Sequence, residues 1–389
     1  MSSQAGRFWL ISGPETLEAG SWVRLVFGYE VPAGGLAAGS ELRFGVPNPS
    51  WSQPLPPHQR FWQWQPGDPK PYMGYFRRNT RIDVKTQGQA VVNGWSRMEQ
   101  RRGERTSPQR WWMRMEVMWA DLAEGDQIEI VYGDTTWGEK GVAVQNFPYG
   151  PGDFQLWLRR AGQREWVEAD GSPICLTVVP GEWRSTLAVI PSVLRPGEPV
   201  EVRVAAHDGA WNRPTWGLSG PIRVCVVGAG ADEQAGRTVQ ADGQQQVGLL
   251  LAGRRQGGPI RVRVGGEVGR GQSNPAVVQA DGPRIFWGDI HGKTDFSDDG
   301  HKPIDDYLAY AREVSLLDFT AVTDHSGCCG ANWITTQQKA AEATEPGRFV
   351  VLKAFEWSYR RGHRNIYFNN HRVEEPLEPA LLEDHERFF

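Results

Sequence analysis

Short runs of alternating apolar and polar residues, separated by Gly and Pro, occupy the chain from residue 7 to residue 280, for example at 22–27, 127–132 and 260–264. Alternation with a period of two is typical of strands with one buried face, and Gly and Pro divide such strands into short pieces. Pro also cannot donate to a central ladder, so the Pro-rich stretch at 47–71 is expected to form loops. The pattern therefore predicts an irregular, loop-rich β-sandwich.

The strand pattern restarts after Pro180. Leu-Arg-Pro-Gly-Glu-Pro-Val at 194–200 echoes Leu-Glu-Ala-Gly-Ser-Trp-Val at 17–23, and strand-like runs follow at 221–227 and 246–251. This spacing is typical of immunoglobulin-like domains, although no Cys-Trp-Cys core signature is evident. A chain of 389 residues is long enough for two to four domains. We therefore expect a loop-rich sandwich domain at 7–180 and an immunoglobulin-like sandwich domain at 181–280.

Composition limits the partners and the compartment. The net charge is -4 and no block of Lys and Arg stands apart from acidic neighbours, so nucleic acid is not an expected partner. The N-terminus has no secretion signal, and no run of about 18 apolar residues suggests a membrane span. Four cysteines are too few and too scattered for a disulfide scaffold. These features predict a cytoplasmic protein with no membrane contact.

The hydrophobic period changes after residues 281–283. Short apolar strands are predicted at 284–288, 318–323 and 348–355, and helices are predicted between them at 304–316 and 332–344. Strands that alternate with helices favour parallel pairing and right-handed crossovers. Residues 283–389 are therefore expected to begin an α/β sheet or barrel.

Each of these predicted strands is followed by metal-ligand residue types: Asp289 and His291, Asp324 and His325, and Glu356. The carboxyl ends of parallel strands meet at one edge, where active sites of α/β folds lie. Imidazole and carboxylate ligands suit zinc, manganese and iron, and a bridging carboxylate can hold two such ions. The pattern predicts a metal site with Glu356 as the bridge.

The motifs Gly-Asp-Ile-His-Gly-Lys-Thr at 288–294, Thr-Asp-His at 323–325 and Glu-Trp-Ser at 356–358 resemble the polymerase and histidinol phosphatase (PHP) superfamily, in an uncharacterised branch. The resemblance implies a distorted seven-stranded α/β barrel of the TIM type. It further implies two or three divalent metal ions and hydrolysis of a small-molecule or phosphoester substrate by metal-activated water. His291, His325 and Glu356 match metal ligands of that family.

Lys293 departs from the family pattern, because it stands where the family usually has a second His. An ammonium group is not a metal ligand. Lys293 either holds an anionic substrate as a point charge or marks the loss of one ion.

The remaining candidate residues each have an alternative role. Asp299 is a candidate metal ligand in an Asp-Asp-Gly turn, which is also ordinary loop chemistry. His363 is a candidate ligand and Arg364 a candidate oxyanion clamp, unless both belong to a solvated basic turn. Asp324 is expected to orient an imidazole or to transfer a proton.

Chain length complicates the hydrolase hypothesis. Residues 284–389 supply three or four strands, whereas a complete barrel needs roughly 200 residues, so we expect activity to require further C-terminal residues. The main alternative is a non-catalytic β-sandwich binding module with a remnant barrel. Such a module would bind carbohydrate or protein through tryptophans such as Trp62, Trp64, Trp111 and Trp112. Hydrolysis of a carbon–nitrogen bond is a third possibility.

Overall fold

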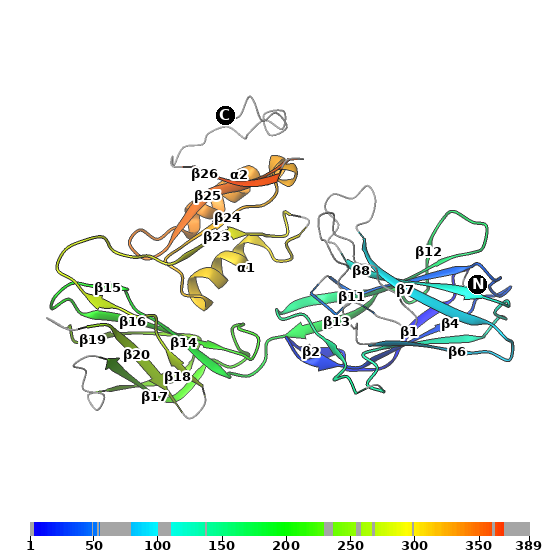
Figure 1. Cartoon of the computed structure of the whole chain (residues 1–389), viewed down its shortest axis with the longest axis horizontal. Helices are drawn as coiled ribbons and strands as arrows, with labels where there is room; N and C mark the ends of the chain where they lie inside the picture. The colour runs from blue at the N-terminus through cyan, green and yellow to red at the C-terminus, as the bar shows by residue number, and fades with distance from the viewer. Residues whose placement is uncertain are drawn as a thin grey trace, which may run out of the picture. The chain divides into compact units, whose positions relative to one another are not determined.

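The computed structural model describes residues 4–48, 50–52, 54, 79–99, 110–136, 138–228, 236–253, 258–266, 269–297, 299–359 and 362–368. The chain divides into two compact units, and the division falls between Val179 and Pro180. Figure 1 shows the strands and helices coloured along the chain.

The first unit contains two main sheets. One has the order β1 (Arg7–Ser12), β4 (Leu25–Glu30), β9 (Gln127–Tyr132), β6 (Thr80–Lys85). The other has the order β2 (Thr16–Glu18), β13 (Ile174–Val179), β11 (Tyr149–Arg159), β5 (Glu41–Gly45), β8 (Arg110–Met118), β7 (Val91–Glu99), and β12 (Val167–Glu168) pairs with β11. A small ribbon pairs β3 (Trp22–Val23) with β10 (Val142–Ala143).

Aromatic rings join the two sheets of the first unit. Phe27 of β4 lies 5.2 Å from Phe44 of β5 and 5.0 Å from Phe154 of β11, measured between ring centroids. All three side chains are fully buried, as expected for the inner faces of a sandwich. Trp112 is also buried, and the Arg43 guanidinium lies 4.0 Å from its ring centroid. Trp112 therefore contributes to packing, whereas Trp62 and Trp64 lie outside the described residues.

A second sandwich begins the second unit. One sheet contains β14 (Ser185–Val189), β16 (Val200–His207) and β19 (Gln246–Leu251). The other contains β18 (Arg237–Gln244), β17 (Leu218–Gly228), β20 (Ile260–Gly265) and β21 (Arg270–Gln272), and a ribbon pairs β15 (Val193–Leu194) with β22 (Val277–Val278). In β20, Ile260, Val262 and Val264 are buried while Arg261 and Arg263 are exposed, which is the period-two pattern seen in the sequence.

Asp208 fixes the loop that follows β16. Its side chain is 2% exposed, and its Oδ1 atom accepts hydrogen bonds from the backbone N–H groups of Ala210 and Asn212, both at 2.8 Å. Its Oδ2 atom accepts from the Gly181 N–H at 2.9 Å and from Asn212 Nδ2 at 3.0 Å. One buried carboxylate thus ties this loop to the start of the second unit.

A mixed sheet follows the second sandwich. Its order is β23 (Gly288–Gly292), β24 (Phe319–Val322), β25 (Val350–Tyr359), β26 (Gly362–Tyr367). The first three strands are parallel, and β26 returns antiparallel to β25. Helix α1 (Ile304–Ala309), continued by the π-helical turn η1 (Tyr310–Val314), connects β23 to β24, and α2 (Ser326–Ala343) connects β24 to β25. The strands and helices predicted after residue 283 thus have counterparts in the structure, but the first strand is shifted: β23 begins at Gly288, where the predicted strand ends, so Asp289 and His291 lie within it and not after it.

Both helices contribute to one core beside the sheet. Ile304 and Leu308 of α1 and Ala340 of α2 pack in a buried cluster with Val322 of β24 and Val351 of β25. The connections from β23 to β24 and from β24 to β25 both step to the next strand in the same direction across the sheet. Because such crossovers are right-handed, both helices lie on the same face. Phe355 and Trp357 of β25 belong to a helix-side cluster with Trp333 of α2, so the Glu356 side chain between them leaves the strand on the opposite face.

The mixed sheet contacts the second sandwich through specific polar groups. The Arg203 guanidinium donates to Asp318 Oδ1 at 2.8 Å, and Trp287 Nε1 donates to Ser192 Oγ at 2.8 Å. The buried His207 donates from Nε2 to the Val314 carbonyl at 2.8 Å, and burial lowers the pKa of this imidazole. These contacts place the start of β24 and the end of η1 against the sandwich.

The prediction of an α/β barrel is wrong. In the described residues, strands predominate, α1 and α2 are the α-helices, and the sheet of β23, β24, β25 and β26 is open. A barrel would continue with another helix and another parallel strand, whereas the chain after β25 returns as an antiparallel neighbour. No helix in the described ranges is long and apolar enough to cross a membrane.

Candidate metal centre

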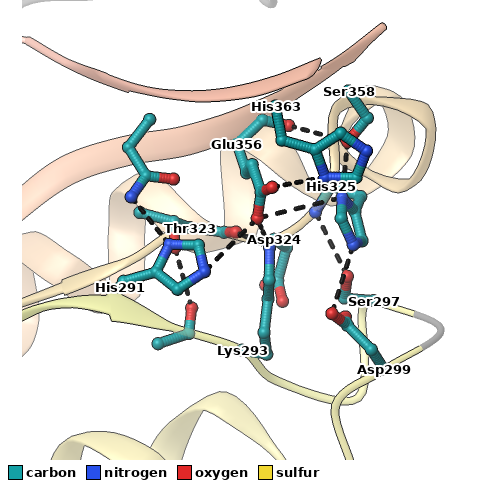
Figure 2. Close-up of polar contacts among 12 residues, drawn as sticks. His291, Lys293, Ser297, Asp299, Thr323, Asp324, His325, Glu356, Ser358 and His363 are labelled. Atoms are coloured by element: carbon teal, nitrogen blue, oxygen red, sulfur yellow. Dashed lines mark hydrogen bonds and ion pairs between the residues drawn. The ribbon is translucent and has the colours of Figure 1, made fainter. Parts of the chain in front are cut away.

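Polar side chains gather where β23 and β24 end beside β25 and β26. Figure 2 shows His291, Lys293, His325 and His363 around the carboxylate of Glu356. The sequence predicted Glu356 just after a strand, but it lies inside β25, which runs on to Tyr359. It reaches the strand-end site because its backbone N–H donates to the Asp324 carbonyl at 2.9 Å, next to the end of β24.

Alternation along β25 and β26 determines which side chains reach the site. Glu356 pairs with Asn365 and Ser358 pairs with His363, and residues paired directly across an antiparallel ladder share one face. The opposite face carries Trp357, which packs in a buried cluster with residues of α2 and β26. The hairpin therefore directs its polar side chains to the site and its apolar side chains into a core.

The Glu356 carboxylate is the centre of the cluster. Its side chain is 6% exposed, Oε1 lies 2.6 Å from His363 Nδ1, and Oε2 contacts the Lys293 ammonium. Oε2 also lies 3.6 Å from His291 Nε2 and 3.9 Å from His325 Nδ1. Burial acts to raise the pKa of Glu356, but the hydrogen bond and charge of Lys293 outweigh it and leave the pKa lowered.

Three side chains have the spacing of a metal site. His325, Glu356 and His363 each offer one ligand atom, and these atoms lie within 4.8 Å of one another. The two imidazole rings meet edge to face, with centroids 5.0 Å apart. His325 is held by Ser358 Oγ at its Nδ1 atom and by Asp299 Oδ2, 3.2 Å from its Nε2 atom. Two imidazoles and one carboxylate fit zinc, manganese or iron.

His291 lies beside this triad, and its position is fixed by a residue that the sequence analysis did not assign to the site. Asn365 Nδ2 lies 2.7 Å from His291 Nδ1, and the other ring nitrogen, Nε2, faces Glu356. Thr323 Oγ1 lies 3.4 Å from the same Nδ1 atom. The imidazole is 53% exposed, so a ligand has access to it.

Asp299 and Asp324 differ in their surroundings. Asp299 is 42% exposed and faces His325; burial raises its pKa, but hydrogen bonds from His325 and Ser297 outweigh this and leave the pKa lowered. Asp324 is 3% exposed and accepts from the Thr294 N–H and hydroxyl, each at 2.7 Å. Burial raises the pKa of Asp324 in spite of these bonds. Asp324 thereby anchors the loop after β23 to the end of β24.

The structure brings together most of the predicted site residues and separates one. Arg364 lies between His363 and Asn365 on β26, so its side chain leaves the strand on the face opposite to the site. Ser358 and Asn365 were missed as site residues. The continued alternation of polar and apolar residues at 355–358 was the signal that both lie on strands of one hairpin.

No protein-family model matches the chain, and no curated protein matches it. Some solved structures show weak similarity. The adhesin InvE of Yersinia pseudotuberculosis is 8% identical over 70% of this chain and 58% of its own, with a TM-score of 0.19. The human OSCAR ligand-binding domain is 13% identical over 70% of this chain and 97% of its own, with a TM-score of 0.16. The major pilin subunit BcpA of Bacillus cereus is 7% identical over 72% of this chain and 64% of its own, with a TM-score of 0.22.

These scores are too low to establish a shared fold, and the chain spans only 58% of the length of the adhesin. The PHP resemblance is wrong, because no family model matches and the described residues form an open mixed sheet and two strand-rich sandwich regions. The hydrolase and phosphoesterase assignments depended on that resemblance and fall with it. The alternative expectation, a β-sandwich module, agrees better with the described strands.

Proposed function

We propose that this chain is a β-rich binding module that holds one divalent metal ion at His325, Glu356 and His363. The observation that carries the proposal is the convergence of their three ligand atoms within 4.8 Å, on side chains from two separate parts of the mixed sheet. Isolated histidines are usually structural, but two imidazoles beside a buried carboxylate form the donor set of transition-metal sites. Zinc, manganese and iron are the candidate ions.

The exposure of the centre supports a ligand-binding role. The His363 side chain is 52% exposed, so an ion held there has coordination positions on the solvent side. Three protein ligands leave at least one position of a tetrahedral ion open. An acidic group of a ligand, such as a carboxylate or a phosphate, fits that position because it supplies an anionic oxygen to the ion.

The proposal predicts that His363→Ala weakens binding of Mn²⁺ or Zn²⁺ about 100-fold, since one of three protein ligands is lost. Arg364→Ala is the matched control, because Arg364 occupies the adjacent position of β26 on the opposite face and should bind metal as the parent does. Elemental analysis after equilibrium dialysis measures the metal content of both variants. Equal metal content in the His363→Ala and Arg364→Ala variants, or no metal in the parent protein, would refute the proposed metal centre.

The proposed ligand has a separate test. Acetate or inorganic phosphate added to the Mn²⁺-loaded protein should displace water from the ion and lower the water-proton relaxation rate. An unchanged water-proton relaxation rate would refute the proposed binding of an acidic ligand to the ion.

The pH dependence of metal binding should respond to Asp299. The hydrogen bond to Asp299 raises the pKa of His325, and a protonated imidazole does not bind metal. Asp299→Asn should lower the pKa of His325 and so move the acid limit of metal binding to lower pH, measured as metal content from pH 5 to pH 8. Asp305→Asn, on the exposed side of α1, should leave that limit unchanged. A loss of affinity at every pH would show instead that Asp299 is itself a ligand.

We also propose that the protein is located in the cytoplasm. Cys175 and Cys225 both carry free thiols, and Cys175 is exposed. Free thiols on the surface suit a reducing compartment. The predicted absence of nucleic-acid and membrane partners stays a prediction.

A further inference from the structure

Lys293 places its own positively charged ammonium group inside the candidate metal centre. Its side chain is only 13% exposed, and its Nζ atom donates to the Thr323 carbonyl at 2.6 Å and to Glu356 Oε2. The first contact is to the backbone at the end of β24 and the second is to a side chain of β25. The ammonium group is thus held between two neighbouring strands, and a swing toward solvent would break both contacts.

The two oxygens of Glu356 face different environments. Oε1 lies 2.6 Å from the Nδ1 atom of the exposed His363, whereas His325 Nδ1 lies 3.9 Å from Oε2. Oε2 faces the Lys293 ammonium and lies 3.6 Å from His291 Nε2. His291 and Oε2 are together a donor pair of the kind that a second ion requires, and a carboxylate with one oxygen on each side is the usual bridge of a two-ion site. The ammonium group lies against that second position.

We propose that Lys293 limits the centre to a single ion, because its ammonium group replaces a second metal ion on Oε2 of Glu356. A divalent cation placed between His291 and Oε2 would meet a fixed positive charge at short range, beside the Lys293 and Glu356 side chains that are only 13% and 6% exposed, so the repulsion is screened less than in bulk water. Lys293 also neutralises Glu356 on that side, which removes the attraction that a second ion would need. Lys293 is therefore a specificity-determining residue that sets the number of ions.

This inference rests on the proposed metal centre, and the two are separable by counting ions. The parent protein, Lys293→Met and Lys293→Gln are dialysed against Mn²⁺ at neutral pH, and their metal content is measured by elemental analysis. We expect about one ion per chain in the parent and about two in each variant. Lys293→Gln retains an amide donor toward Glu356 and the Thr323 carbonyl, which guards against loss of the fold, and circular dichroism checks that each variant is folded. Lys339→Met, at a partly exposed position of α2, is the matched control and should bind one ion.

A second substitution identifies the donor of the additional ion. His291→Ala combined with Lys293→Gln should return the count to about one, because the second ion loses its imidazole ligand while the triad is intact. One ion in the parent and still one in the folded Lys293 variants would overturn the role of Lys293 and leave the metal centre standing. Two ions in the parent would also overturn it. No ion in the parent or in any variant would overturn both proposals.

Discussion

Replacing Glu356 with Gln should lower the free energy of unfolding of the metal-free protein by about 3 kcal/mol, because the largely buried Lys293 ammonium loses its counter-charge. Lys293 is 13% exposed and Glu356 6%, so water compensates little. Urea unfolding in the presence of a chelator measures the loss. Combining Glu356→Gln with Lys293→Met should cost less than the two single changes added together, since the double variant no longer buries the unpaired charge that each single change leaves.

The control for this cycle is an exposed ion pair of the same unit. Lys339 Nζ lies 3.0 Å from Asp305 Oδ2, but these side chains are 33% and 65% exposed. Asp305→Asn should therefore change stability by about 0.5 kcal/mol or less. If the Glu356 and Lys293 effects add within about 0.5 kcal/mol, the two groups are not coupled, and the account of a buried ion pair is wrong.

Replacing Asp208 with Ala should destabilise the second sandwich by about 4 kcal/mol. The change removes a carboxylate that is 2% exposed and leaves the N–H groups of Gly181, Ala210 and Asn212 without their acceptor. A hydrogen bond to a charged group contributes about 1.5 to 3 kcal/mol, and an unsatisfied buried donor adds a desolvation cost. Urea unfolding followed by tryptophan fluorescence measures the effect.

Asp242→Ala is the comparison for Asp208, because Asp242 is an exposed residue of β18. It should change the free energy of unfolding by about 0.5 kcal/mol or less. Asp208→Asn should lie between the two, since the amide oxygen still accepts a hydrogen bond while the charge is lost. Equal stability of the Asp208→Ala and Asp242→Ala variants would show that the loop after β16 is not held by this carboxylate.

The strands of both sandwiches follow from local sequence, because alternation records which side chains face a core. The run at 260–264 is one example, and its alternation matches the burial of β20 residue by residue. Closure of a barrel is a property of pairing between distant strands and has no comparable local signal. The barrel prediction depended on short motifs, and these motifs are compatible with the open mixed sheet in which they lie.

The sequence predicted the site residues whose positions follow from the ends of parallel strands. His291 lies near the end of β23 and His325 follows β24, its parallel neighbour, so their placement at one edge of the sheet follows from topology. Glu356 was expected after its strand but lies within it, because a polar residue between Phe355 and Trp357 resembled the end of a buried run. The contacts of Lys293 and Asn365 depend on side-chain directions across three strands, which the period of one segment does not record.

The three candidate ligands are distributed unevenly along the chain. His325 precedes helix α2, whereas Glu356 and His363 lie on the two strands of the hairpin that follows it. An ion bound by all three would cross-link them, so that the chain containing the helix and the hairpin would form closed loops, as it does between two residues joined by a disulfide. Such cross-links reduce the conformational entropy of the unfolded chain. The helix and the hairpin would then be expected to unfold together and not one after the other.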